Sequence, residues 1–95
     1  MSTSKHRTVI QEPSFTDAFN QLRISYQRLD EVLSGVHSIL VVHPELCPLI
    51  EGTVLSMIKT LEFPHVPPLR IFFTYTDDEV HLRHVEVIED GAGEV

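Results

Sequence analysis

The feature that most constrains the fold is a long stripe of apolar side chains between residues 15 and 40. Its members are Phe15, Phe19, Leu22, Tyr26, Leu29, Leu33, Val36 and Leu40. Their spacings alternate between four and three residues, which is the period of an α-helix with one buried face. We predict a helix that begins at Phe15, where Ser14 and Asp17 approximate a capping box. Gly35 weakens a helix by up to about 1 kcal/mol relative to Ala, so we expect a break or kink there.

A second helix is predicted for residues 48–61, antiparallel to the first. Pro44 must end the preceding helix, because it biases His43 away from the α conformation. Apolar residues then return at helical spacing, with Gly52 as a weak point near the start. They are Leu49, Ile50, Val54, Leu55, Ile58 and Leu61.

Strands are predicted on both sides of the helices. Residues 6–11 form a short β-branched stretch, and three prolines make residues 63–68 an extended connector. Residues 69–75 and 80–88 then read as an antiparallel hairpin, because aromatic and β-branched side chains dominate them and turn residues separate them. The apolar positions of the second hairpin strand change parity, so we expect a β-bulge around Arg83 and His84.

These elements predict an α+β fold with the order strand, helix, helix, strand, strand. An antiparallel sheet of about three strands should be covered on one face by the helix pair. We expect one domain over residues 6–89, a disordered N-terminus over residues 1–5 and a disordered acidic tail over residues 90–95. The predicted core consists of Phe15, Phe19, Leu22, Tyr26, Leu29, Leu33, Leu55, Ile58, Ile71, Phe73 and Leu82.

The charge of the chain argues against general nucleic-acid binding. The formal net charge is −7, whereas counterion release requires clustered Lys and Arg side chains. Residues 77–95 hold seven acidic side chains against one basic side chain, Arg83, so the acidity lies near the end of the chain. A lone cysteine, a polar start and no apolar run long enough to cross a membrane predict a cytoplasmic protein that does not enter the membrane.

The sequence favours neither a metal site nor a cofactor. His81 and His84 lie three positions apart in a predicted strand, and His37 and His43 are six apart, which misses the spacing of ligands on one helical face. Cys47 could have a lowered thiol pKa at a helix entrance, although a buried structural cysteine is the simpler interpretation. We expect no metal and no cofactor.

Arg70 and Arg83 are the side chains that we single out. Both belong to the predicted hairpin, and either could share a sheet face with His65 or His84 and bind a phosphate or an acidic partner. The alternative is that both are strand charges that discourage aggregation between sheets. Arg70 should point away from the helices, because it alternates with Ile71 and Phe73.

Three segments together resemble the RelE/ParE toxin superfamily of bacterial type II toxin–antitoxin systems. They are Arg7-Thr-Val-Ile-Gln-Glu-Pro-Ser-Phe, then His43-Pro-Glu-Leu, then Pro68-Leu-Arg-Ile-Phe-Phe-Thr-Tyr-Thr-Asp-Asp-Glu-Val-His-Leu. The resemblance covers residues 6–88. It implies the fold of that superfamily, with the working surface on the solvent side of the sheet and Arg70 at the position of the hairpin arginine.

The resemblance implies two different activities. Its ribonuclease members cut messenger RNA on the ribosome with basic residues, and here the candidates are Arg70, His65, Arg83 and His84. That basic set is mostly missing, because the connector offers only His65 and an acidic end follows Ile88. ParE-like members instead poison DNA gyrase by binding, which needs no such set.

We therefore expect a toxin-related protein that binds an antitoxin-like protein or a cellular target protein, with Arg70, His81 and Arg83 as binding residues. The alternatives are an mRNA interferase and a non-toxic interaction module. Whether the chain is an enzyme stays open. A partner, or a second copy in a homodimer, should engage the exposed helix face or a free sheet edge.

Overall fold

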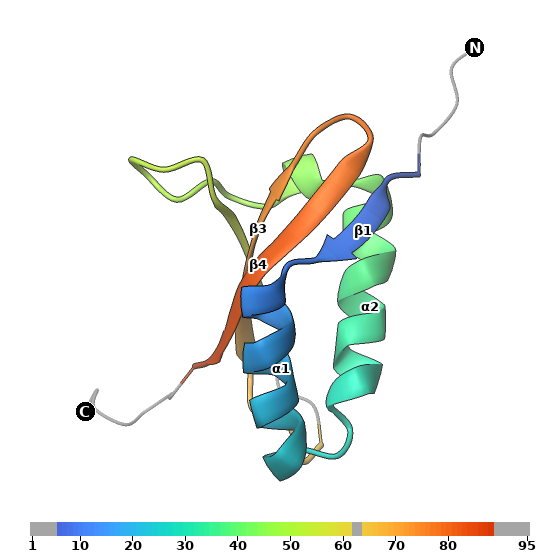
Figure 1. The fold of residues 1–95 in the computed structure, drawn as a ribbon, viewed down its shortest axis with the longest axis vertical. Coiled ribbons are helices and arrows are strands. Elements are labelled where there is room, and N and C mark those ends of the chain that lie inside the picture. Colours follow the sequence, from blue (N-terminus) through green and yellow to red (C-terminus); the bar gives the residue numbers. More distant parts are fainter. Residues whose placement is uncertain (1–5, 62–63, 89–95) are drawn as a thin grey trace.

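The computed structural model describes residues 6–61 and 64–88, so the predictions for residues 1–5 and 90–95 lie outside the described part. Two helices and four strands make an α+β fold (Figure 1). In chain order they are β1 (Thr8–Gln11), α1 (Pro13–Ser25), α2 (Leu29–Val42), the 3-10 turn η1 (Pro44–Leu46), β2 (Ser56–Lys59), β3 (Leu69–Tyr75) and β4 (Glu79–Val87). No helix among these is long and apolar enough to cross a membrane.

The sheet is mixed and has four strands in the order β1-β4-β3-β2. β2, β3 and β4 pair antiparallel, whereas β1 pairs parallel with β4. The prediction of three antiparallel strands is therefore wrong in strand number and in the direction of one pairing. β1 and β2 are the two edge strands, and the helices connect them. β3 and β4 lie between the edge strands, and β4 pairs with β1 in the same direction.

The predicted break in the first helix lies earlier than Gly35. α1 ends at Ser25 because Tyr26 adopts an extended conformation, and α2 begins three residues later at Leu29. Asp30 and Glu31 lie in the first turn of α2, where acidic side chains favour the helix dipole. The antiparallel helix pair thus consists of α1 and α2 (Figure 1), and Gly35 lies inside α2 on its exposed side.

Gly35→Ala should stabilise the protein by about 0.5–1 kcal/mol. An added Cβ would meet no atom within 4 Å, and alanine loses less backbone entropy than glycine on entering a helix. Urea denaturation followed by circular dichroism measures the change. A lower midpoint than that of the wild type would contradict this interpretation of Gly35.

The predicted second helix over residues 48–61 is wrong. Residues 48–57 form a hairpin arm, in which Leu49 bridges Ser56 and the Ile50 N–H donates to the Leu55 carbonyl at 2.8 Å. Gly52 turns the chain with a φ of 82°, a conformation that glycine adopts without strain. The arm and β2 share Ser56 and Met57. Ser56 and Ile58 of β2 face the helices, whereas Met57 and Lys59 face away from them.

The start of α1 is tied to β4 rather than capped as predicted. The helix begins at Pro13, and no side chain caps its first turn. Instead the Ser14 hydroxyl donates to the carbonyl oxygen of Arg83 at 2.6 Å. That carbonyl belongs to a bulge in β4, so Ser14 supplies a hydrogen bond at the point where the strand ladder is interrupted.

The core lies between the two helices and one face of the sheet. Seven of the predicted core residues are buried, while Leu22, Tyr26 and Ile58 pack partly buried against them and Leu55 stays outside the cluster. The buried seven are Phe15, Phe19, Leu29, Leu33, Ile71, Phe73 and Leu82. The predicted core list left out Val36 and Leu40, although both belong to the apolar stripe, and the prediction missed Val66, Leu69, Val80 and Val85.

Candidate functional site

The second face of the sheet is not covered by the helices, and we call it the uncovered face. Strand alternation places on it the side chains that do not point into the core. Register then puts Lys59 beside Arg70 and Glu86 in one row across three strands. In β2, β3 and β4 these side chains are Met57, Lys59, Arg70, Phe72, Thr74, Glu79, His81, Arg83, His84 and Glu86, and in β1 the register adds Thr8 and Ile10.

Arg70 lies on the uncovered face, opposite the buried Ile71 and Phe73. Its guanidinium Nη1 donates to Glu86 Oε2 across the hairpin at 2.8 Å. About two fifths of each of these two side chains is exposed, so the pair is accessible from solvent. The arginine that the sequence singles out is therefore already matched by a carboxylate on the neighbouring strand.

The expected bulge is present in β4. Phe72 pairs with His84 and Phe73 pairs with Leu82, which leaves Arg83 as the extra residue. The Arg83 side chain donates from Nε to the Thr74 hydroxyl at 3.2 Å, so it lies over β3 on the uncovered face. The bulge restores the inward direction of the following apolar residues and brings Arg83 and His84 onto the same side.

His84 contacts an aromatic ring and a carboxylate. Its ring lies tilted against Phe72, with 5.9 Å between the ring centroids, and its Nε2 is 3.7 Å from Glu86 Oε1. Glu86 thus stands between Arg70 and His84, and Phe72 supplies an apolar centre among these charges.

His81 is held between two glutamates. Its Nδ1 is 2.5 Å from Glu12 Oε2, and its Nε2 is 2.9 Å from Glu79 Oε1. Ionised carboxylates only accept, so both ring nitrogens donate when the imidazole is protonated. The hydrogen bonds to Glu12 and Glu79 raise the pKa of His81, and the hydrogen bond from His81 lowers the pKa of Glu12.

The structure does not bring His65 to this face. His65 has a φ of 67° and lines a hollow with Ile24, Ser25, Gln27 and Arg28, next to the turn between α1 and α2. Four of the five residues singled out from the sequence, Arg70, His81, Arg83 and His84, share one face, and His65 lies elsewhere.

Carboxylates are the part of the site that the sequence analysis missed. The pairing of Arg70 with Glu86 follows from the hairpin register once the bulge is placed, so it could have been predicted from the sequence. Glu12 is 69 positions from His81, and nothing local in the sequence indicates that contact.

Neither metal nor thiol chemistry is supported by the described residues. Among them, no group of three or more His, Cys, Asp or Glu side chains is arranged to hold a metal ion. Burial and the nearby Glu45 raise the pKa of the Cys47 thiol, which disfavours the thiolate that a nucleophile requires.

Searches against known protein families and against curated proteins found no match for this chain. The uncovered face must therefore be interpreted from its own geometry.

Proposed function

We propose that this chain is a RelE/ParE-like, toxin-related protein that acts in the bacterial cytoplasm by binding a protein partner through the uncovered face. The order of elements supports the proposal, because the predicted strand, two antiparallel helices and antiparallel hairpin occur in that order, although the segment His43-Pro-Glu-Leu follows α2 and opens no α-helix. β2 adds one strand to that order without moving the hairpin that carries Arg70.

The observation that carries the proposal is the pairing of cations with carboxylates on this face. Arg70 is paired with Glu86, and His81 lies between Glu12 and Glu79. A phosphate chain would have to displace these glutamates and would be repelled by them. A protein partner with both signs of charge can instead add hydrogen bonds to the existing pairs, with Phe72 as an apolar contact.

The alternative, an mRNA interferase, requires Arg70, His65, Arg83 and His84 to act on one phosphate and its leaving oxygen. In this structure His65 lies beside the turn between the helices, away from the other three. Glu86 also lies against both Arg70 and His84, where a cleavage site would need net positive charge.

Induction of the gene in a bacterial host tests the proposal. Growth inhibition with intact messenger RNA and a co-purifying protein supports a binding toxin, and inhibited gyrase would identify one target. Ribosome-dependent cleavage of messenger RNA would contradict the proposal and favour the interferase. Unaffected growth would leave the non-toxic interaction module as the better interpretation.

Arg70→Ala should separate binding from folding. The guanidinium is partly solvated, and its ion pair lies at the surface, so the loss of unfolding free energy should stay within about 1 kcal/mol. Growth inhibition and co-purification should both fall to background. Thermal unfolding and the induction assay measure the two effects.

Arg23→Ala is the matched control, because Arg23 forms a comparable exposed ion pair with Asp30 away from the sheet. It should leave toxicity and co-purification unchanged. Equal losses in both variants would show that Arg70 carries no specific role.

A further inference from the structure

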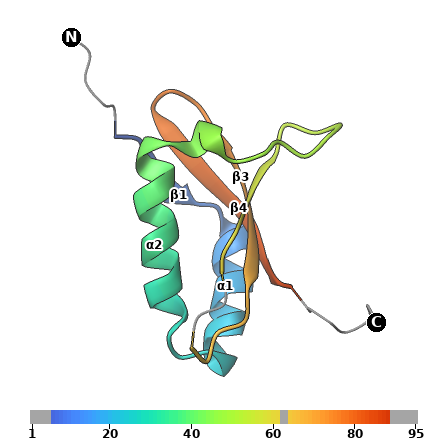
Figure 2. The same ribbon diagram turned by 180° about the vertical axis from the view of Figure 1, so that it is seen from behind.

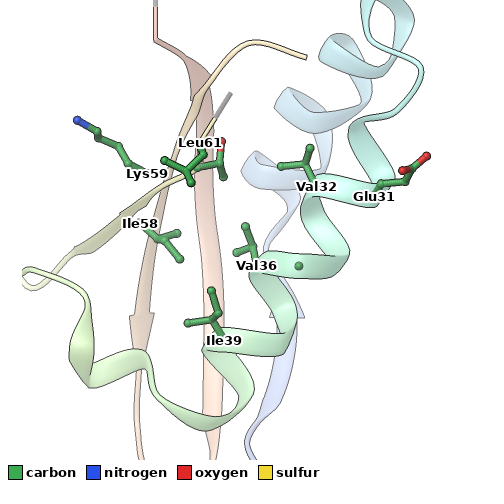
Figure 3. A pocket seen from close by; sticks show the side chains of 9 residues that line it. Glu31, Val32, Val36, Ile39, Ile58, Lys59 and Leu61 are labelled. Carbon is green, nitrogen blue, oxygen red and sulfur yellow. The ribbon is translucent and has the colours of Figure 1, made fainter. Parts of the chain in front are cut away.

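An apolar groove runs between α2 and β2, on the helix side of the sheet (Figure 3). It has a volume of about 460 Å³, within the range of ligand and peptide pockets. Its apolar lining comes from Val32, Gly35, Val36, Ile39, Ile58 and Leu61. Leu61 is 87% exposed and Ile39 is 48% exposed, so the groove forms an apolar patch that is exposed to solvent.

The hairpin arm of residues 48–57, like the groove, exposes apolar side chains to water. It projects from the body of the domain beyond the end of α2 (Figures 1 and 2). Its backbone is held by hydrogen bonds within the arm, including that from the Met57 N–H to the Pro48 carbonyl at 3.0 Å. Yet Val54 is 79% exposed and Leu49 is 62% exposed. A two-stranded hairpin is only marginally stable alone, so contact with a further surface would favour it.

The arm carries an acidic side chain, and the groove is lined by one side chain of each charge: Glu31, which is paired with Arg28, and Lys59. Glu51 lies at the turn of the arm, beside Gly52. Lys59 stands at the rim of the groove, and its ammonium group points away from α2 (Figure 3). Within residues 6–61 and 64–88, no ion pair is found for either side chain. A chain segment that enters the groove across the edge strand β2 would therefore lie close to the Lys59 ammonium group.

We propose that two copies of this chain form a dimer in which the arm of each copy lies in the groove of the other. Leu49 and Val54 would then contact Val36, Ile39 and Leu61 of the partner copy. Glu51 would pair with Lys59 of the partner copy. A protrusion and a hollow of matching chemistry on one chain suit a two-fold interface, in which every contact occurs twice.

Of the uncovered face, this dimer uses only Lys59, which lies on the edge strand β2. Arg70, His81 and His84 lie on the opposite side of the sheet from the groove, so the dimer neither requires nor excludes the proposed binding of another protein there. Failure of one proposal does not affect the other.

Charge reversal and rescue provide the test. Sedimentation equilibrium of the full chain should show a monomer–dimer equilibrium in the wild type. Glu51→Lys and Lys59→Glu should each weaken dimerisation about tenfold, because two favourable pairs become two repulsive ones. The double variant should restore the wild-type dissociation constant. Asp17→Lys, an exposed reversal on α1, is the control and should leave dimerisation unchanged.

Gly35→Leu tests the groove without weakening the fold. Leucine is a better helix former than glycine, and there is open space at this position, so the variant should remain folded while its side chain fills the groove. It should be monomeric at concentrations where the wild type is dimeric. A wild type that stays monomeric at about millimolar concentration, or single reversals without a restored double variant, would overturn the proposal.

Discussion

Phe15→Ala should lower the unfolding free energy by about 3–5 kcal/mol, the range for removing a buried phenylalanine. Phe15 is 0% exposed and its ring stacks on Phe19, with 5.7 Å between the centroids. The side chain enters the core from the first turn of α1, close to where Ser14 is tied to β4. A cavity there would loosen the helix from the sheet. Small domains have only about 5–15 kcal/mol of stability, so this loss is a large fraction.

Two further positions of α1 make the prediction specific. Ile24 is 78% exposed, so Ile24→Ala should change the unfolding free energy by less than about 0.5 kcal/mol. Leu22 is half-buried, and Leu22→Ala should fall between the other two variants. Urea denaturation of the three variants measures their losses of unfolding free energy, which should decrease in the order Phe15→Ala, Leu22→Ala, Ile24→Ala. A similar loss at Ile24 and Phe15 would contradict burial as the cause of these effects, because alanine has a higher helix propensity than either residue.

The stripe from Phe15 to Leu40 illustrates what sequence periodicity can predict. It identified buried positions in both helices, because the connection at residues 26–28 is short enough to keep the apolar side chains on one side. For the same reason the period gave no sign that the helix ends at Ser25. Gly35 was the more visible irregularity, yet an exposed glycine is tolerated in α2, where Leu33 and Val36 beside it are buried.

Residues 48–61 show the opposite case. Their apolar spacing fits a helix, but β-branched side chains and Gly52 fit a hairpin equally well, and tertiary pairing with β3 decides the outcome. The parallel pairing of β1 with β4 has no local signal, because it joins residues about 70 positions apart. The uncovered face was partly predictable, since the parity change around Arg83 located the bulge that orients Arg83 and His84.

The stability of the protein should depend on pH through His81. The two glutamates raise its pKa in the folded state, so the protonated ring stabilises the fold fully below its ordinary pKa of about 6.5. That contribution should disappear as the pH rises through the raised folded value. The pKa of Glu12 is lowered instead, so its contribution is present above the ordinary value and lost as the pH falls through the lowered one.

The His81 cluster should therefore contribute most at about pH 5–6 and least in alkaline solution. Glu12 faces the imidazole from the start of α1 and Glu79 faces it from β4, and Arg83 of β4 also lowers the pKa of Glu12, so the cluster joins α1 to β4. Urea midpoints of the wild type and His81→Gln should differ most near pH 6 and converge near pH 9. NMR titration of His81 should show a pKa above the ordinary histidine value of about 6.5. A midpoint difference that stays constant over this pH range would contradict the assignment of both carboxylates to a protonated His81.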